Sequence, residues 1–72
     1  MASNYVICIR NDGYRASLEV RKLYQRLADP EADRYDMVRV VDESGDDYLY
    51  PSSHFVAVDL PAETERTLEE AS

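Results

Sequence analysis

The acidic segment DESGDD, Asp42 to Asp47, holds the residues of the chain that are best suited to chemistry. A calcium-binding loop needs oxygen ligands at alternate positions, a glycine at its sixth position and a glutamate at its twelfth. Counted from Asp42, Ser44 and Asp46 fit the third and fifth positions, but the sixth residue is Asp47 and the twelfth is Ser53. The segment therefore fails the calcium-loop pattern. It is typical of a solvated hairpin turn, and weak cation binding remains the alternative.

The segment Ser52–His54 and the single cysteine are the other candidates for chemistry. Serine and histidine work together in hydrolases, but there they come from distant parts of the chain and act beside an oxyanion hole. Cys8 and His54 fall short of the four ligands that a structural zinc ion needs. The two glycines, Gly13 and Gly45, are too few for a phosphate-binding loop. We therefore predict that the protein is not an enzyme and that it uses no metal ion or cofactor.

The charge of the chain is distributed unevenly over its 72 residues, which form one small domain with a thin core. Residues 1–41 carry seven Lys and Arg against six Asp and Glu, whereas residues 42–72 carry one arginine against nine acids. An acidic surface repels nucleic acid and fits a basic protein partner. With no secretion signal and no apolar run near the length of a membrane span, we predict a cytoplasmic protein without membrane contact, as a monomer or weak homodimer.

Five segments rich in β-branched and aromatic residues predict strands, because Gly, Pro, Asn and Asp separate them. The expected strands cover residues 4–10, 21–28, 37–42, 47–50 and 54–60. The sequence from Asp29 to Ala32 predicts the start of a one-turn helix in a connecting loop. Pro61 and the acids after it predict a short helix over residues 61–71. Glu69 and Glu70 lie at the wrong end for the helix dipole, so we expect this helix to fray.

Residues 15–28 are compatible with two structures. Four apolar residues have the spacing of one helix face, namely Val20, Leu23, Tyr24 and Leu27. The residues between them have a high helix propensity. Leu23, Gln25 and Leu27 also alternate as in a strand, and a hairpin with two apolar faces needs further strands to cover it. The first structure predicts an α+β fold, with this segment helical against a three- or four-stranded sheet. The second predicts the all-β class, which we favour.

Gly45 predicts a tight turn between the third and fourth strands, because glycine adopts the positive φ that hairpin loops need. A four-residue loop, Glu43–Asp46, places Val41 opposite Tyr48. Both faces of the hairpin are then substantially apolar. One face carries Arg39, Val41, Tyr48 and Tyr50, and the other carries Val38, Val40 and Leu49.

The stretch YLYPSSHFVAV is similar to the end of an SH3-type barrel, in which an aromatic strand, a proline, one tight turn with a serine and an aromatic-led last strand follow in this order. A longer pattern, SLEVRKLYQRLAD, RVVDESGDDYLYP and FVAVDLP, resembles a group of small uncharacterised bacterial proteins. The resemblance implies a small SH3-like barrel of about five strands with a short C-terminal helix and with residues 21–28 extended, and it implies no activity. The chain has no tryptophan and no Ala-Leu-Tyr-Asp-Tyr stretch, so binding of proline-rich peptides is not implied.

The density of tyrosine predicts a surface for protein contact. Six tyrosines in 72 residues is a high count, and tyrosine is enriched where proteins touch each other. The predicted partner-binding residues are Arg39, Tyr48, Tyr50, Asp46 and Asp47, joined by Tyr14 and Tyr24. In the alternative interpretation the rings cap a thin core and keep their hydroxyls in water. We predict a non-catalytic interaction module or accessory subunit that docks on a basic partner; the alternative is a regulator that binds a small ligand or a divalent metal at residues 42–47.

Overall fold

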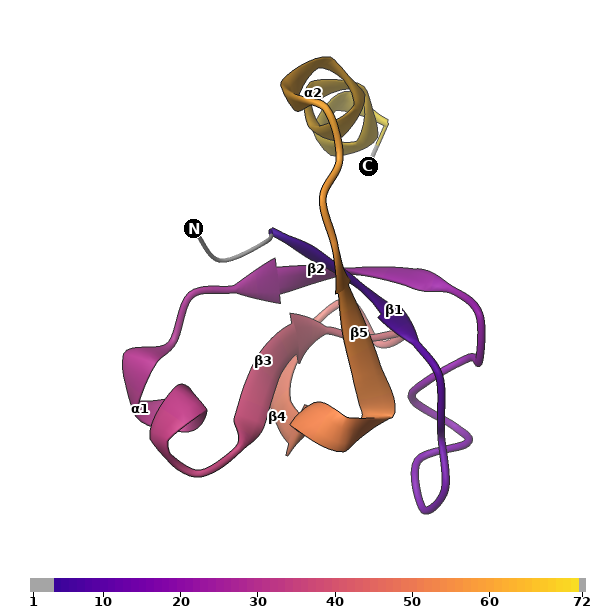
Figure 1. The fold of residues 1–72 in the computed structure, drawn as a ribbon. Helices are drawn as coiled ribbons and strands as arrows, with labels where there is room; N and C mark the ends of the chain where they lie inside the picture. Colours follow the sequence, from indigo (N-terminus) through magenta and orange to yellow (C-terminus); the bar gives the residue numbers. More distant parts are fainter. Residues whose placement is uncertain (1–3, 72) are drawn as a thin grey trace.

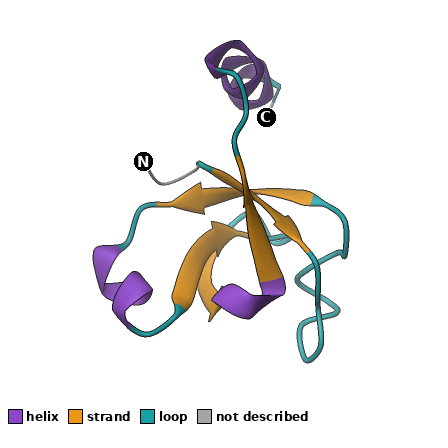
Figure 2. Cartoon of the chain, viewed as in Figure 1, coloured by secondary structure: helices purple, strands orange, loops and turns teal. Residues whose placement is uncertain are grey.

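The computed structural model of the protein describes residues 4–71, which contain five strands, two α-helices and one 3₁₀ turn (Figure 1). Figure 2 shows short helical segments among the strands and loops of the body, and one helix that stands apart from it. The strands are β1 (Tyr5–Cys8), β2 (Leu23–Leu27), β3 (Met37–Val41), β4 (Asp47–Pro51) and β5 (Phe55–Val58). The helices are α1 (Pro30–Arg34) and α2 (Ala62–Glu70), and the 3₁₀ turn is η1 (Ser52–His54).

All five strands form one antiparallel sheet in the order β4-β3-β2-β1-β5. Each strand pairs with the next one in the chain until β5, which returns to pair with β1. Figure 1 shows β1, β2 and β5 lying over β3 and β4, so that the core forms between two halves of a bent sheet. The sheet is open, because β4 and β5 form its edges and no ladder joins them within residues 4–71. The predicted five-stranded, mainly β domain with a short C-terminal helix is confirmed.

Residues 15–28 contain no α-helix, so the alternative α+β prediction is wrong. Arg21 has a φ of 73°, which no right-handed helix accommodates. Leu23–Leu27 instead pair with β1 on one side and with β3 on the other. Tyr24 is buried, whereas Val20, which the helical stripe requires in the core, is 42% exposed. Pairing with two neighbouring strands overrides the helix propensity of this segment.

The core consists of a few large side chains from all five strands and the loop before β2. Leu18, Cys8 and Val40 are the most completely buried. The ring of Phe55 meets the ring of Tyr24 edge to face, with 6.3 Å between centroids. The core cluster is Val6, Cys8, Leu18, Tyr24, Val38, Val40, Tyr50 and Phe55. Two of its members are tyrosines, so polar hydroxyls reach into the edge of this core and need partners there.

The loop between β3 and β4 has three residues, Glu43–Gly45, rather than the four that the sequence suggested. Asp42 and Asp46 already pair across the hairpin, since the Asp42 N–H donates to the Asp46 carbonyl oxygen at 3.0 Å. Gly45 has the predicted positive φ, at 88°. A left-handed residue at this place is what closes a three-residue hairpin loop.

The shorter loop shifts the register of the hairpin by one residue. Tyr48 lies opposite Val40, and not opposite Val41 as we expected. A shift of one residue turns a strand over, because side chains alternate between faces. Tyr48 and Tyr50 therefore lie on the core side of β4, and Leu49 lies on the outer side. The predicted assignment of hairpin faces is wrong for this reason.

The observed ends of the strands and of the C-terminal helix differ from the expected ends by at most two residues. The strand expected over residues 4–10 covers Tyr5–Cys8, and the one expected over residues 54–60 covers Phe55–Val58. Pro51 is the last residue of β4, opposite Met37, and it is tolerated because β4 is an edge strand that needs no further N–H donor there. Before α1, the side chain of Asp29 accepts from the Ala32 N–H at 3.1 Å, which confirms the predicted helix start.

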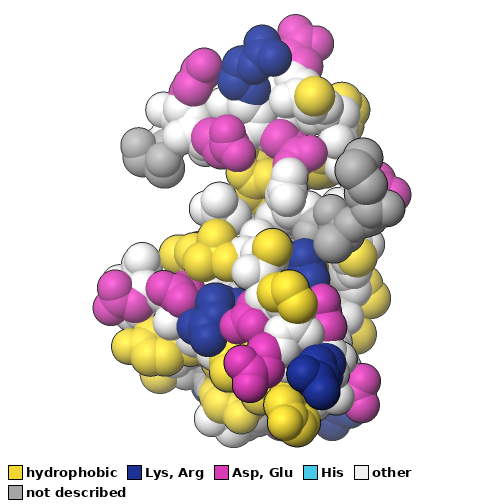
Figure 3. All heavy atoms as spheres, turned by 90° about the vertical axis from the view of Figure 1, so that its left-hand side faces the viewer, with side chains coloured by type: hydrophobic (Ala, Val, Ile, Leu, Met, Phe, Trp, Pro, Cys, Tyr) yellow, Lys and Arg dark blue, Asp and Glu magenta, His cyan; other side chains and the backbone are white. Residues whose placement is uncertain are grey.

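Helix α2 lies outside the core, over the outer face of β1 and β2. None of its side chains is buried, and Glu65 accepts a hydrogen bond from Asn4 at 2.9 Å. Between helix and sheet is a cavity of about 430 Å³, with Tyr5 and Leu23 on the sheet side and Leu68 on the helix side. Figure 3 shows α2 as a lobe set off from the body of the sheet. The helix therefore covers part of the sheet without completing the core.

Two matched valine substitutions test which face of the sheet forms the core. Val40 is fully buried, whereas Val56 is 46% exposed. We expect Val40→Ala to lower the free energy of unfolding by about 2 kcal/mol, because two buried methyl groups are lost and a cavity remains. We expect Val56→Ala to lower it by less than about 1 kcal/mol. Urea unfolding measures both values, and equal losses would contradict this assignment of faces.

Candidate functional site

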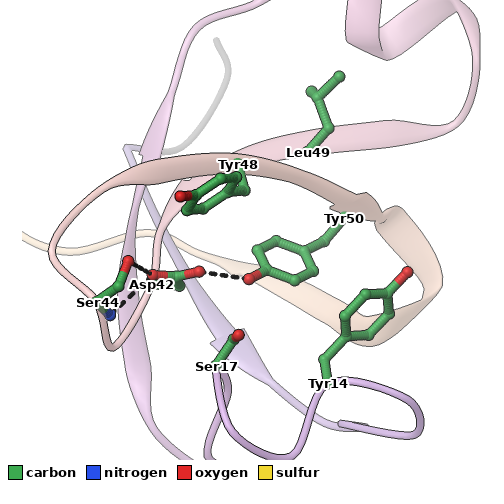
Figure 4. A pocket seen from close by; sticks show the side chains of 7 residues that line it. All are labelled: Tyr14, Ser17, Asp42, Ser44, Tyr48, Leu49 and Tyr50. Carbon is green, nitrogen blue, oxygen red and sulfur yellow. Dashed lines mark hydrogen bonds between the residues drawn. The ribbon is translucent and has the colours of Figure 1, made fainter.

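An open cavity of about 320 Å³ lies between the β3–β4 hairpin and the loop that precedes β2 (Figure 4). We call it the tyrosine groove. Its lining residues are Tyr14, Ser17, Asp42, Ser44, Tyr48, Leu49 and Tyr50. Figure 4 shows the side chain of Leu49 pointing away from the others. Six side chains therefore shape the groove, three of them tyrosines and one an acid.

Backbone hydrogen bonds hold the loop of the groove against the hairpin. A turn at Asn11–Gly13 reverses the chain, and the Tyr14 N–H donates to the Asn11 carbonyl oxygen at 2.8 Å. Leu18 then enters the core and anchors the loop there. The Glu43 N–H donates to the Ser17 carbonyl oxygen at 3.0 Å. The loop and the hairpin turn, 26 residues apart at this contact, are thereby fixed side by side.

Asp42 is the one acid of the groove and is only 7% exposed. Its Oδ1 accepts from the N–H and from the hydroxyl of Ser44, at 2.9 and 2.5 Å, and its Oδ2 accepts from the hydroxyl of Tyr50 at 2.5 Å. Burial acts to raise the pKa of the Asp42 carboxyl, but the hydrogen bonds from Ser44 and Tyr50 hold it below its ordinary value. The carboxyl is therefore ionised at neutral pH.

The charge of Asp42 has no counter-ion within residues 4–71. No ion pair of these residues includes Asp42, and its hydrogen-bond donors are all neutral. The neighbouring acids differ, since Glu43 pairs with Lys22 at 2.6 Å and Asp47 pairs with Arg39 at 2.9 Å. A buried carboxylate without a counter-ion is unusual, because transfer of a charge out of water is costly.

The three tyrosine rings differ in exposure. Tyr48 is 51% exposed and Tyr14 is 36% exposed, whereas Tyr50 is 4% exposed. The Tyr14 ring meets the Tyr50 ring edge to face, with 5.0 Å between centroids. Burial and the hydrogen bond to Asp42 raise the pKa of Tyr50 to about 12, so its hydroxyl stays protonated as a donor. Tyr50 thus forms the floor of the groove, and two accessible rings stand beside it.

Tyr24 belongs to the core and to a second polar network behind the turn. Its hydroxyl donates to Glu43 at 2.6 Å and accepts from the Glu19 N–H at 2.7 Å. Burial, and then the bond to Glu43, raises the pKa of Tyr24 well above its ordinary value. Hydrogen bonds from Lys22 and Tyr24 hold the pKa of Glu43 below its ordinary value. The turn is therefore fastened to β2 on one side and to the core on the other.

The structure separates some of the predicted partner-binding residues. Arg39 lies on the outer face of the hairpin with Leu49, and its guanidinium pairs with Asp29 and with Asp47, each at 2.9 Å. Tyr50 lies on the other face, in the core. A patch that contains both Arg39 and Tyr50 is thus wrong, and the register shift is the reason.

Other predicted residues do meet. Tyr14, Tyr48 and Tyr50 all line the tyrosine groove, although they lie up to 36 positions apart in the sequence. Asp46 is exposed in the acidic turn next to this groove. Tyr24 is only 5% exposed, lies in the core and does not line the groove. Of the four predicted tyrosines, two therefore belong to the core, Tyr24 and Tyr50, and two are accessible at one cavity, Tyr14 and Tyr48.

Ser53, His54 and Cys8 do not form a reactive group. The hydroxyl of Ser53 lies 3.5 Å from His54 Nδ1, and His54 Nε2 faces the Asp12 carbonyl oxygen at 3.4 Å rather than a carboxylate. A hydrolase triad needs an acid at that second nitrogen. Cys8 is fully buried, which raises the pKa of its thiol. Within residues 4–71 no three His, Cys, Asp or Glu side chains are placed to hold a metal ion.

No family model matches the chain, and no curated protein or solved structure matches it at a significant level. None of the helices in residues 4–71 has the length and the apolar character that a membrane crossing requires.

The central role of Asp42 was not predicted from the sequence. Asp42 and Ser44 entered that analysis only as candidate cation ligands, and Ser17 not at all. A signal was present, because an aspartate two residues before a serine, followed by a glycine, is typical of a turn in which the acid side chain caps the backbone. The position of Ser17 depends on a contact between distant segments, which no local pattern reveals.

Replacement of Asp42 by asparagine tests the role of the buried charge. Asp42→Asn keeps a side chain that can cap the turn but removes the ionised acceptor of Tyr50. At pH 7 we expect the free energy of unfolding to fall by about 1–3 kcal/mol. Because the pKa of Asp42 is lowered in the folded protein, its ionised form stabilises the fold at neutral pH, and this contribution is lost as the pH falls through the folded-state pKa.

The stability difference between wild type and Asp42→Asn should accordingly narrow between about pH 5 and pH 2. Urea unfolding at a series of pH values measures it. A difference that stays constant down to pH 2 would show that Asp42 is not held ionised by the fold. Asp46→Asn, at an exposed acid of the same turn, is the matched control and should change the free energy of unfolding at pH 7 by no more than about 0.5 kcal/mol.

Proposed function

We propose that the protein is a non-catalytic, cytoplasmic interaction module with an SH3-like domain, and that it docks on a basic partner protein through the tyrosine groove and the acidic turn beside it. The order of elements supports the SH3-like assignment. Strand β4 ends in Tyr50 and Pro51, one 3₁₀ turn follows, and Phe55 opens β5, which returns to β1. This is the order on which the sequence resemblance rests.

The observation that carries the proposal is the combination of accessible aromatic rings with unpaired acids at one place. Tyr14 and Tyr48 are accessible at an open cavity, and Tyr48 lies on an edge strand. Asp42 and Asp46 lie in the adjoining turn, and no ion pair of residues 4–71 includes either of them. Tyrosine provides much of the binding energy in protein interfaces. Complementary charge steers the encounter and selects the partner.

The protonation states in the groove favour binding over proton transfer. The Tyr50 hydroxyl holds the Asp42 carboxylate ionised, and that carboxylate in turn keeps the hydroxyl protonated. A general acid or base works best with a pKa near the operating pH. Here the pKa values of both groups are moved away from neutrality, in opposite directions. The groove thus presents fixed donors, acceptors and charge.

The alternative of a divalent-metal or small-ligand regulator at residues 42–47 has less support. A calcium ion takes six to eight oxygen ligands. In this turn, however, Glu43 is engaged by Lys22 and Asp47 by Arg39. Asp42 and Asp46 would then be the only carboxylates left for the ion, and backbone oxygens would have to supply all its other ligands. The engaged acids therefore favour an interaction module over a metal site in this turn.

Affinity capture with matched variants tests the proposed function. We expect wild-type protein to retain a basic protein from cell extract at low salt, and less of it at moderate salt. Tyr48→Ala should lower the affinity of that purified partner by at least about tenfold. Tyr35→Ala is the control, because this ring is 71% exposed and lies outside the groove.

Two results would contradict the function. One is the absence of any retained basic protein at either salt concentration. The other is an equal affinity of the purified partner for wild type, Tyr48→Ala and Tyr35→Ala, since the contact would then lie elsewhere on the surface.

A further inference from the structure

We propose that the tyrosine groove is a site for one arginine side chain of the partner, whose guanidinium lies beside the ring of Tyr48 and above the carboxylate of Asp42, and whose aliphatic stem lies toward the ring of Tyr14. This inference rests on the proposed function and names the chemical group that the groove takes. It is carried by three properties of the groove, namely its charge, its free hydrogen-bond acceptor and its accessible rings.

The floor of the groove carries a negative charge that the described residues leave without a counter-ion. Asp42 is 7% exposed, and its donors, Ser44 and Tyr50, are neutral. The lining of the groove includes no lysine or arginine. Charges interact more strongly in a partly buried site than in water. A ligand with one positive charge is therefore attracted to Asp42 and supplies the counter-charge that the lining of the groove lacks.

The remaining acceptor capacity of Asp42 selects among cations. A carboxylate has about four acceptor positions. Ser44 occupies two of them on Oδ1, and Tyr50 occupies one on Oδ2. One position on Oδ2 remains. This is too little for a divalent metal ion, which requires several oxygen ligands.

A guanidinium fits these conditions better than an ammonium. The ammonium of lysine is compact and strongly hydrated, and it carries three donors that need partners. The guanidinium of arginine is weakly hydrated, and its flat faces stack on aromatic rings. It can donate one N–H to Oδ2 of Asp42 while one of its faces contacts the ring of Tyr48 and its outer N–H groups stay in water.

The rings and the size of the groove complete the argument. Tyr14 and Tyr48 are accessible, whereas Tyr50 is fixed in the floor. Figure 4 shows the ring of Tyr48 beside the bond between Asp42 and Tyr50, and the ring of Tyr14 beyond the ring of Tyr50. The volume of about 320 Å³ is at the lower end of the range for ligand pockets. Such a volume suits one long side chain.

A titration with short peptides tests the site without knowledge of the partner. The probes are acetyl-Gly-Gly-Arg-Gly-Gly-amide, the same peptide with citrulline, which is a neutral isostere of arginine, and the same peptide with lysine. Binding to ¹⁵N-labelled protein is followed through backbone amide shifts. We expect the arginine peptide to shift the amides of Ser17, Ser44 and Tyr48, and to bind at least about tenfold more tightly than the citrulline peptide and about threefold more tightly than the lysine peptide.

Matched variants separate the groove from general acidity. Tyr48→Ala, at a half-exposed ring, should weaken the arginine peptide about fivefold or more, whereas Tyr35→Ala should leave it within about twofold. Asp42→Asn should weaken it about tenfold, and Asp46→Asn less than about threefold. The amide spectrum of each free variant shows whether it is folded. If Asp42→Asn does not fold, Tyr48→Ala and the citrulline peptide still decide the question.

Equal binding of the arginine, citrulline and lysine peptides would overturn the inference, and so would shifts that spread over other acidic surfaces. If those results were found while a purified basic partner still lost affinity on Tyr48→Ala, the proposed function would stand and only the arginine site would fail. If the partner were also insensitive to Tyr48→Ala, both would fail.

Discussion

The hydrogen bond from the Tyr50 hydroxyl to the Asp42 carboxylate is the interaction on which the rest of the structure depends. It connects the first residue of the hairpin turn to a ring that is part of the core. Through Ser44, the same carboxylate shapes the loop. The next residue, Glu43, holds the hydroxyl of Tyr24 from β2. In a domain whose core has so few side chains, these polar links place the turn, two tyrosines and three strands relative to one another, because each buried polar group needs its partner.

The three-residue loop that begins after Asp42 determines which side chains are accessible at the groove. Because Asp42 closes a three-residue loop, Tyr48 and Tyr50 lie on one face of β4, and Leu49 lies with Arg39 on the other. Tyr50 is then buried in the core, and Tyr48, which is nearer the turn, remains accessible at the groove. A register one residue different would exchange the two faces. The exposure of Tyr48 at the groove is therefore a consequence of the turn.

The sequence predicts much of the fold and less of the site. Alternation in Leu23–Leu27 and the turn at Gly45 are local signals, and both are correct in the structure. The register is not a local signal, because it depends on whether Asp46 belongs to the loop or to the ladder. In the structure Asp46 belongs to the ladder, since its carbonyl oxygen accepts from the Asp42 N–H. The sequence predicts that the tyrosines either contact a partner or cap the core, but which of them are buried follows from the register. Ser17 reaches the groove through a contact with Glu43 that sequence spacing does not reveal.

A titration of the Asp42 side-chain carboxyl carbon by NMR tests most directly whether this buried group is held ionised by its neutral donors. We predict a pKa below the ordinary value of 3.8 in the wild-type protein, and a higher pKa in Tyr50→Phe, which removes one donor and keeps the ring. A wild-type pKa at or above the ordinary value, or one that Tyr50→Phe leaves unchanged, would contradict the account.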